Sequence, residues 1–263
     1  MNLPAATLGY SWTSRLLLAF SFACLITAVG VQKARAALGD ETVVPRINSF
    51  GGFCIRCDLS TRKLAGAHFV GGDFQHASLV GSDLRGAMFL GSNFTAADFS
   101  HADMRGASIT GAILQNAEFG GTNMMGLAAT GATLDDADMD GARLDGASMM
   151  ASRMRRVKAH GAHFDHANLT GADLAGGEFD DASFRGADLM GAVLAGGKFS
   201  RADFKGAGMR GANLNGADLS GAVNLTKEQL AETCGDRGTR LPVGLTGRLC
   251  NGAARIVIVH REP

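Results

Sequence analysis

Four short groups of residues in this chain have the types and spacing to carry chemistry. Cys54 and Cys57 form a C-x-x-C pair, which can act as a redox centre, a structural disulfide or half of a zinc site. Three histidines recur at intervals of three residues. A basic cluster precedes them, and two pairs of adjacent aspartates flank both groups. The residues are His160, His163 and His166; Arg153, Arg155, Arg156 and Lys158; Asp135 with Asp136, and Asp180 with Asp181.

The elements that must position these groups are set by a repeat of five residues. From Asp58 to Leu219 a small residue, a polar residue and a large apolar residue recur in one phase through 33 pentads. Leu, Phe, Met or Ile occupies 31 of the 33 centres, and Ala occupies 22 of the 33 small positions two residues earlier. In a strand, positions five apart point to opposite faces, so the chain must turn once in every pentad. Frequent Gly two positions after the centre, as at Gly86, suits such corners.

These pentads resemble the A-[DN]-L-x-x motif of the pentapeptide-repeat family, as at Ala172-Asp173-Leu174 and Ala187-Asp188-Leu189. The resemblance implies an all-β fold, a right-handed quadrilateral parallel β-helix, with four pentads per coil and about eight coils. The centre and the small residue before it are then both expected to point inward. Two centres are only Ala, at Ala129 and Ala159, and the larger Leu127 and Val157 at the small positions are expected to fill the interior there.

Residues twenty positions apart are expected to lie directly over one another in such a β-helix, and this changes how the charged groups are interpreted. Asp135, Asp136 and Asp138 fall under Arg155, Arg156 and Lys158, which predicts a neutralised charge ladder in place of a nucleic-acid patch. The three histidines are spread around a corner and along one side, too far apart for a shared ion. The adjacent aspartates are interpreted as solvated corners. No cofactor, metal or nucleic acid is therefore expected.

The spacing of twenty residues also predicts two outer faces that differ in charge. One face is acidic, with Asp58, Asp98 and Glu118 among its residues. The opposite one carries almost no charge, with His68, Asp188 and Arg210 as its exceptions. Because apolar patches on a surface usually mark contacts, we expect this face to bind a protein partner or a second copy, the alternative being a weakly apolar solvent face. The interaction-face candidates are Val70, Met88, Leu90, Thr110, Thr130, Met150, Thr170 and Met190.

The N-terminal residues 1–36 are expected to be a secretory signal peptide. An apolar run from Leu16 to Val31 follows Arg15, and Ala34-Arg35-Ala36 fits a cleavage box. An uncleaved anchor is the alternative, and it would be the one route to a membrane. Residues 37–53 are expected to be a leader into the β-helix, which spans 54–224, and residues 225–263 a helix, a disulfide loop and a tail. The chain is therefore expected to be exported, to the periplasm or outside the cell.

Cleavage after the signal would leave four cysteines in an oxidising compartment: Cys54, Cys57, Cys234 and Cys250. They allow three pairings, of which Cys54 with Cys57 and Cys234 with Cys250 is the most economical. Thr226-Lys227-Glu228-Gln229 fits a capping box for a helix running to Cys234, with Gly235 placed to end it. Beyond it, Cys234-Gly235-Asp236, Leu241-Pro242-Val243-Gly244-Leu245 and Cys250 resemble the terminal cap of exported pentapeptide-repeat proteins.

The sequence contains no nucleophile with a base partner and no phosphate-binding loop, so we expect a protein that is not an enzyme. An exported scaffold or interaction module is the first functional hypothesis. The family resemblance implies a second, mimicry of duplex DNA in the protection of type II topoisomerases, which calls for a strongly acidic rod in the cytoplasm. The predicted export signal argues against mimicry. So does the mild charge of residues 54–224, which carry 15 basic and 19 acidic side chains.

Overall fold

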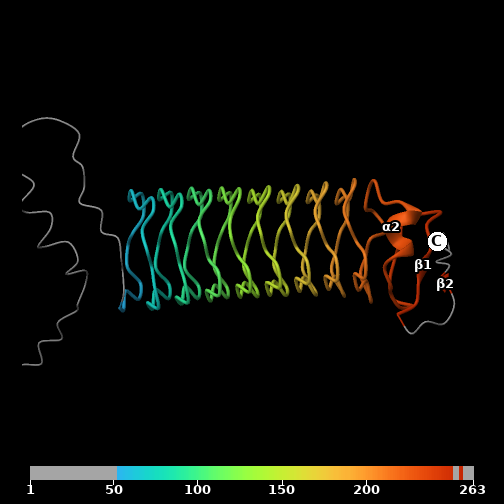
Figure 1. Cartoon of the computed structure of the whole chain (residues 1–263), viewed down its shortest axis with the longest axis horizontal. Helices are drawn as coiled ribbons and strands as arrows, with labels where there is room; N and C mark the ends of the chain where they lie inside the picture. The colour runs from blue at the N-terminus through green and yellow to red at the C-terminus, as the bar shows by residue number, and fades with distance from the viewer. Residues whose placement is uncertain (1–51, 251–254, 257–263) are drawn as a thin grey trace, which may run out of the picture. The chain divides into compact units, whose positions relative to one another are not determined.

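Successive coils of the chain are joined by backbone pairing between residues twenty positions apart. The structure is a computed structural model, and it describes residues 52–250 and 255–256. Parallel pairing begins at Phe53 with Asp73 and recurs every five residues to Asp203 with Val223. Each paired residue lies one position before a pentad centre, so all four sides of the coils keep one register (Figure 1). The expected four-sided parallel β-helix is therefore confirmed at this level.

Each pentad satisfies its backbone in two directions. The amide of a centre, such as Phe74, donates to the carbonyl of Asn93 on the next coil at 2.7 Å, and Asn93 donates back to Gly72 at 2.9 Å. Within the pentad, the amide of Ala77 donates to the carbonyl of Phe74 at 3.0 Å, which closes a four-residue turn. The residue before it, His76, has a φ of 57°, as the third residue of a type II turn requires. Glycine occupies most of these corners for that reason.

The interior of the β-helix is filled by the two inward positions of every pentad. From Phe69 to Leu219, the large centres and the alanines before them are almost wholly buried. Phenylalanines on neighbouring coils stack ring on ring, as Phe74 does on Phe94 with centroids 4.7 Å apart. Leu127 and Val157 are buried alongside Ala129 and Ala159, so the expected exchange of volume is confirmed.

A short helix and an irregular segment follow the last pentads. Helix α2, Lys227–Ala231, begins at Thr226, whose hydroxyl accepts from the amide of Gln229 in the expected capping box. It lies beyond the last coil in Figure 1. Strand β1, Gly247–Arg248, pairs antiparallel with β2, Arg255–Ile256.

The helix is shorter than the sequence predicts. It ends at Ala231, not at Cys234, because Cys234 pairs in parallel with Asn213 and so continues the coil stacking. Arg240 pairs with Asp218 in the same way, so this segment stays over the last coil. Of the predicted tail, the structure describes only residues 255–256, which form β2.

The described residues, 52–250 with 255–256, contain no helix long and apolar enough to cross a bilayer. The predicted signal peptide at 1–36 and most of the predicted leader lie outside the described residues.

Candidate interaction surfaces

The outer surface of the β-helix is made of columns of residues spaced by twenty. On each side, the residue before a centre and the residue after it point outward, while the centre and the small residue are buried. The backbone pairing of His68 with Met88, and of each following pair up to Asp188 with Gly208, keeps these columns aligned. A surface of this protein is therefore defined by its column, whatever the distance along the chain.

One side, which we call the uncharged face, consists of the column from His68 to Gly208 and the column from Val70 to Arg210. Its exposed apolar side chains all belong to the second column, and they are between 39 and 47% exposed. Two of them are adjacent at one end of the column, and threonines separate the others. The structure thus brings the predicted interaction-face residues into two adjacent lines. The four exposed apolar side chains are Val70, Leu90, Met150 and Met190.

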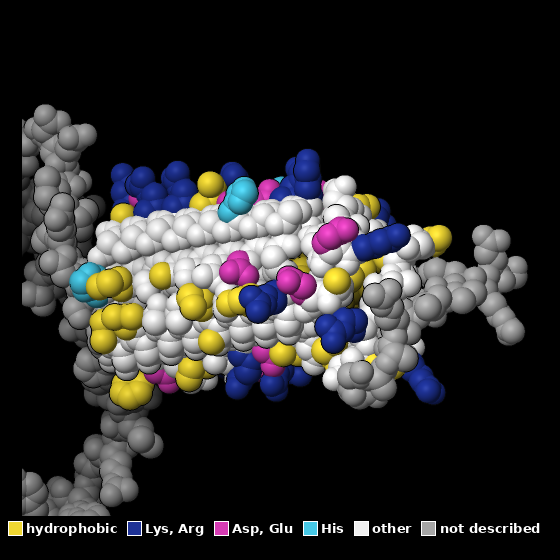
Figure 2. Space-filling model, turned by 45° about the vertical axis from the view of Figure 1, so that its right-hand side comes forward, with side chains coloured by type: hydrophobic (Ala, Val, Ile, Leu, Met, Phe, Trp, Pro, Cys, Tyr) yellow, Lys and Arg dark blue, Asp and Glu magenta, His cyan; other side chains and the backbone are white. Residues whose placement is uncertain are grey.

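The charged side chains are distributed differently. On the side turned to the viewer in Figure 2, hydrophobic side chains are scattered along the rod and most Lys and Arg side chains project at its upper and lower margins. Most of these cations contact a carboxylate of their own or a neighbouring coil. Arg156 donates two hydrogen bonds to Asp136, at 2.7 and 2.6 Å, which lowers the pKa of that carboxyl.

The three arginines of the basic cluster each contact a carboxylate, but only Arg156 contacts the partner that the spacing of twenty predicts. Arg153 and Asp173 are paired through the backbone, yet the guanidinium of Arg153 contacts Asp135 at 2.7 Å. Arg155 contacts Asp173 at 2.5 Å. Both contacts run diagonally, from the outward residue after one centre to the outward residue before the next coil's centre. A search of the sequence for opposite charges eighteen residues apart, and not only twenty, would therefore have predicted both contacts.

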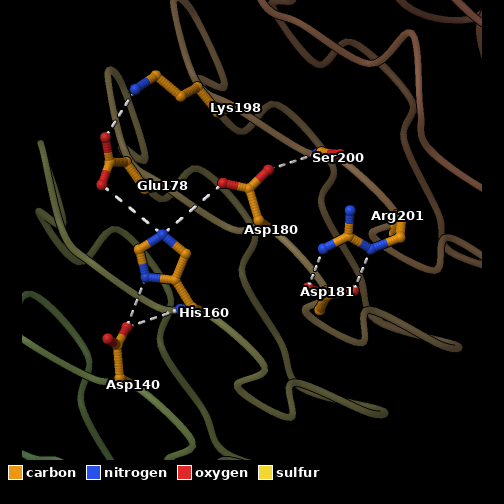
Figure 3. A network of polar contacts seen from close by, with 8 residues as sticks. All are labelled: Asp140, His160, Glu178, Asp180, Asp181, Lys198, Ser200 and Arg201. Carbon is orange, nitrogen blue, oxygen red and sulfur yellow. Dashed lines mark hydrogen bonds and ion pairs between the residues drawn. The ribbon is translucent and has the colours of Figure 1, made fainter.

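A second network of polar contacts, which was not predicted from the sequence, surrounds His160 on the acidic face (Figure 3). Its Nδ1 lies 2.9 Å from Asp140, and its Nε2 lies 3.7 Å from both Glu178 and Asp180. Glu178 also accepts from Lys198 at 2.7 Å, which lowers the pKa of Glu178. The acidic face is thus bridged by a histidine and a lysine at this level, and its carboxylates are held by neighbours.

The histidine triplet is dispersed, as expected. His160 lies on the acidic face, His163 on the next side and His166 at a corner with a φ of 58°. Among residues 52–250 with 255–256, no three His, Cys, Asp or Glu side chains are grouped so that they could hold a metal ion. Asp181, one of the paired aspartates, accepts from Arg201, which lowers the pKa of Asp181.

The four cysteines of the described chain form two disulfides, Cys54 with Cys57 and Cys234 with Cys250. Their Cα atoms lie 5.4 and 4.7 Å apart, within the ordinary range for a disulfide. Of the three possible pairings, the structure therefore has the economical one. One disulfide lies at the first described coil and the other beyond the last pentad, so the two pairs do not form a common site.

The fold and its outer columns define a repeat protein that presents patterned surfaces around an apolar interior. A family model described as pentapeptide repeats matches residues 54–89, 89–126, 152–189 and 187–223, in eight copies and over more than half of the chain. The chain therefore belongs to the pentapeptide-repeat family. No curated protein matches it.

Several solved pentapeptide-repeat structures are similar to this chain. HetL, involved in heterocyst differentiation regulation in the cyanobacterium Nostoc sp. strain PCC 7120, is 22% identical over 74% of this chain and 93% of its own, with a TM-score of 0.39. The plasmid-mediated fluoroquinolone resistance protein QnrB1 is 23% identical over 77% and 90%, with a TM-score of 0.34. A protein from the Arabidopsis thaliana thylakoid lumen is 25% identical over 52% and 67%, with a TM-score of 0.22.

Proposed function

We propose that this protein is an exported, non-enzymatic scaffold that binds another protein through its uncharged face. The observation that carries the proposal is the line of exposed Val70, Leu90, Met150 and Met190 on a side almost without charge. Apolar residues gathered in this way on a surface are typical of contact sites. Methionine in particular adapts its shape to a partner.

The arrangement of polar groups supports a binding role over a catalytic one. The carboxylates that would be candidates for acid and base chemistry are engaged with cations, as Asp136 is with Arg156 and Asp181 is with Arg201. Such pairs are exposed and stabilise only weakly, but they hold the carboxylates ionised at the surface. The polar side chains therefore make a surface pattern, with no nucleophile and base aimed at a common point.

Export is part of the proposal, and it rests on the signal-like sequence at 1–36 together with the two disulfides. Disulfides persist in oxidising compartments and are rare in the cytosol. The expected site of action is the periplasm or the cell exterior, with the membrane involved only if the signal is retained as an anchor.

We also propose that residues 225–250 cap the C-terminal end of about eight right-handed coils. Gln229 supports this, because its Nε2 donates to the carbonyls of Phe204 and Ala207, each at 2.9 Å. An open β-helix end exposes unpaired backbone groups to further strands, which a cap prevents.

Mimicry of duplex DNA is the alternative, and the acidic face argues against it. That face is interrupted by Lys158, His160 and Lys198, and Lys198 and His160 contact its carboxylates. A DNA mimic must present a continuous negative rod to its partner. Mimicry of DNA on a topoisomerase is therefore our second candidate function, after the scaffold.

The test combines localisation with capture of partners. Cell fractionation and the mass of the mature N-terminus are expected to report an exported chain. The double substitution Leu90→Lys with Met150→Lys is expected to lose partners captured by wild type from the exported fraction. Val80→Lys with Val223→Lys adds the same charge on other sides and is the matched control. Recovery of the intact chain in the cytoplasm, with both variants capturing the same partners as wild type, would contradict the proposal.

A further inference from the structure

The column that borders the uncharged face has a charge order that reverses about its middle. It consists of the residues after the centres on the preceding side, next to the corner that leads into the uncharged face. Two arginines are followed by a methionine and then by two aspartates. The backbone pairings from Asp83 with Asp103 to Arg143 with His163 keep these residues in line. In order, the column reads Ala65, Arg85, Arg105, Met125, Asp145, Asp165, Arg185 and Lys205.

A column of this kind is complementary to itself when it is turned end for end. If a second copy lays its uncharged face on the first, related by a two-fold axis that crosses the rods at the level of Met125, each column meets its own copy in reverse order. Arg85 then lies opposite Asp165 of the second copy, and Arg105 opposite Asp145 of the second copy. Met125 meets Met125. Four arginine–aspartate pairs border the contact, because each pair occurs twice in an isologous interface.

The residues of the uncharged face are also complementary to one another about this two-fold axis. Val70 comes opposite Met190, Leu90 opposite Thr170, and Thr110 opposite Met150, so each exposed apolar residue meets an apolar side chain or a threonine. The face carries two ionisable residues between Val70 and Met190, and these also meet: His68 lies opposite Asp188 of the second copy. Ala128 and Thr130 lie at the axis, where small side chains let two flat faces approach.

Other registers are less complementary. Sliding the second copy by one coil in one direction sets Arg85 against Arg185, and sliding it by one coil in the other direction leaves Arg85 with Asp145 but sets Arg105 against Met125. In a parallel arrangement, the column that begins at Ala65 in one copy lies against a different column of the other copy. That second column consists of the residues before the centres on the side that follows the uncharged face. Asp165 then lies against Asp173. Like charges in contact disfavour a partner, and the register centred on Met125 forms more arginine–aspartate pairs than either neighbouring register, so the charges favour it.

We propose that the uncharged face is covered by a second copy of this chain, antiparallel and centred on Thr130. The inference rests on the proposed function, since it names what binds the same face. The arginines keep the capacity to bind a second acid: Arg85 contacts Asp83 at 2.8 Å and Arg105 contacts Asp103 at 2.6 Å, yet each side chain stays about half exposed. A guanidinium has five N–H donors, more than one carboxylate uses.

The area of the uncharged face sets the affinity expected for the dimer, and so the protein concentrations at which it must be measured. Seven coils at about 4.8 Å, with outward columns about 7 Å apart and their side chains, give roughly 400 Å² per copy. A standard stable interface buries about 800 Å² per partner, so this dimer is of the weak class. Sedimentation velocity over a range of concentrations up to about 1 mM is therefore the first measurement, and a reversible monomer–dimer equilibrium is the expected result.

Site-directed cross-linking of the full chain tests the register. In the proposed dimer the two copies of residue 130 face each other at about 10 Å, whereas residues 170 are four coils apart, about 19 Å along the rods. A bismaleimide with a reach of about 10 Å, the spacing of packed sheets, is expected to join copies of the Thr130→Cys variant. It is expected to leave the Thr170→Cys variant, the same substitution on the same face, as monomers. Equal cross-linking of both variants overturns the register.

A charge reversal gives an independent test that does not depend on cross-linking. Arg105→Asp is expected to weaken dimerisation about tenfold or more, and adding Asp145→Arg in the same chain is expected to restore it, because the pair is re-formed with opposite polarity. Unchanged circular dichroism identifies variants that are folded. Failure of the second substitution to restore the dimer in a folded variant overturns the inference.

The outcomes also separate this inference from the proposed function. A wild-type chain that stays monomeric at every concentration, but loses a captured partner on substitution of Leu90 and Met150 by Lys, overturns the second copy and retains the scaffold. A monomer whose captured partners are unchanged by that substitution overturns both.

Discussion

Individual pentads tolerate a change of residue as long as the interior volume is conserved. At two levels of the β-helix the large inward residue moves from the centre to the small position, with Leu127 before Ala129 and Val157 before Ala159, and all four are buried. Both positions point inward, so either can hold the larger side chain. Volume in the interior, and not residue type at one position, is thus the requirement at this scale.

Truncation of Leu127 provides the test at the residue scale. Leu127→Ala leaves two alanines in one pentad and opens a cavity, so the free energy of unfolding is expected to fall by about 2–5 kcal/mol. Chemical denaturation measures the change. Thr133→Ala, at an outward position of the following pentad, is the control and should change the value by no more than about 0.5 kcal/mol. An unchanged midpoint for Leu127→Ala would mean that this residue contributes nothing to the interior.

At the scale of elements, helix α2 is joined to the β-helix by one side chain. Gln229 completes the capping box by accepting from the amide of Thr226 at 2.8 Å, and its Nε2 donates to two carbonyls of the last coils. Leu230 is fully buried beside it. Gln229 therefore donates to carbonyls of the last coils, as the proposed cap requires.

Gln229→Ala is expected to loosen that end. The carbonyl of Ala207 loses its donor, and the carbonyl of Phe204 keeps only the amide of Ala207, at a cost of about 1–3 kcal/mol. Because each coil contacts only its neighbours, the loss is expected to be local. Hydrogen exchange should therefore quicken near residues 204–231 and stay unchanged near residues 84–124. Lys227→Ala, at the exposed start of the same helix, is the control. A uniform rise in exchange along the whole rod would contradict this role.

At the scale of the whole molecule, many surface charges of residues 52–250 are paired with one another. Hydrogen bonds from Arg156, Lys198 and Arg201 lower the pKa of Asp136, Glu178 and Asp181 respectively. Each of these carboxyl groups is ionised more readily in the folded chain than in the unfolded one. Such a group stabilises the fold above its unfolded pKa, and the contribution disappears as the pH falls through the lower, folded value.

The free energy of unfolding is therefore expected to be level from neutral pH down to about 5 and to decline as the pH falls below the ordinary carboxyl values of 4.5 and 3.8. Urea denaturation at a series of pH values measures it. The double variant Asp136→Asn with Asp181→Asn should have a shallower decline, and about 1 M salt should reduce the slope for wild type. A stability that rises between pH 5 and pH 3 would show that the signs assigned to these shifts are wrong.

Some of the ion pairs between coils could not be predicted from the spacing of residues in the sequence. Residues twenty apart do lie over one another, so the pairing of Arg156 with Asp136 followed from spacing alone. Arg153, however, has Asp173 in its own column and Asp135 diagonal to it. Arg156 takes the vertical partner Asp136, and Arg153 takes the diagonal partner Asp135. Differences of a few ångströms decide between them, and a spacing rule cannot resolve such differences.

The sequence by itself determined the period of five, the inward residues, the compensating pair at Leu127 and Val157, and the capping box at Thr226. Each of these depends on local geometry repeated in one phase, so the pattern is written in every pentad. Only the tertiary structure decided the end of α2 at Ala231, the carboxylates around His160 and the pairing of the cysteines. These depend on which groups from distant segments meet at hydrogen-bond or disulfide distance. That is a property of the folded coils and not of the order of residues along any one of them.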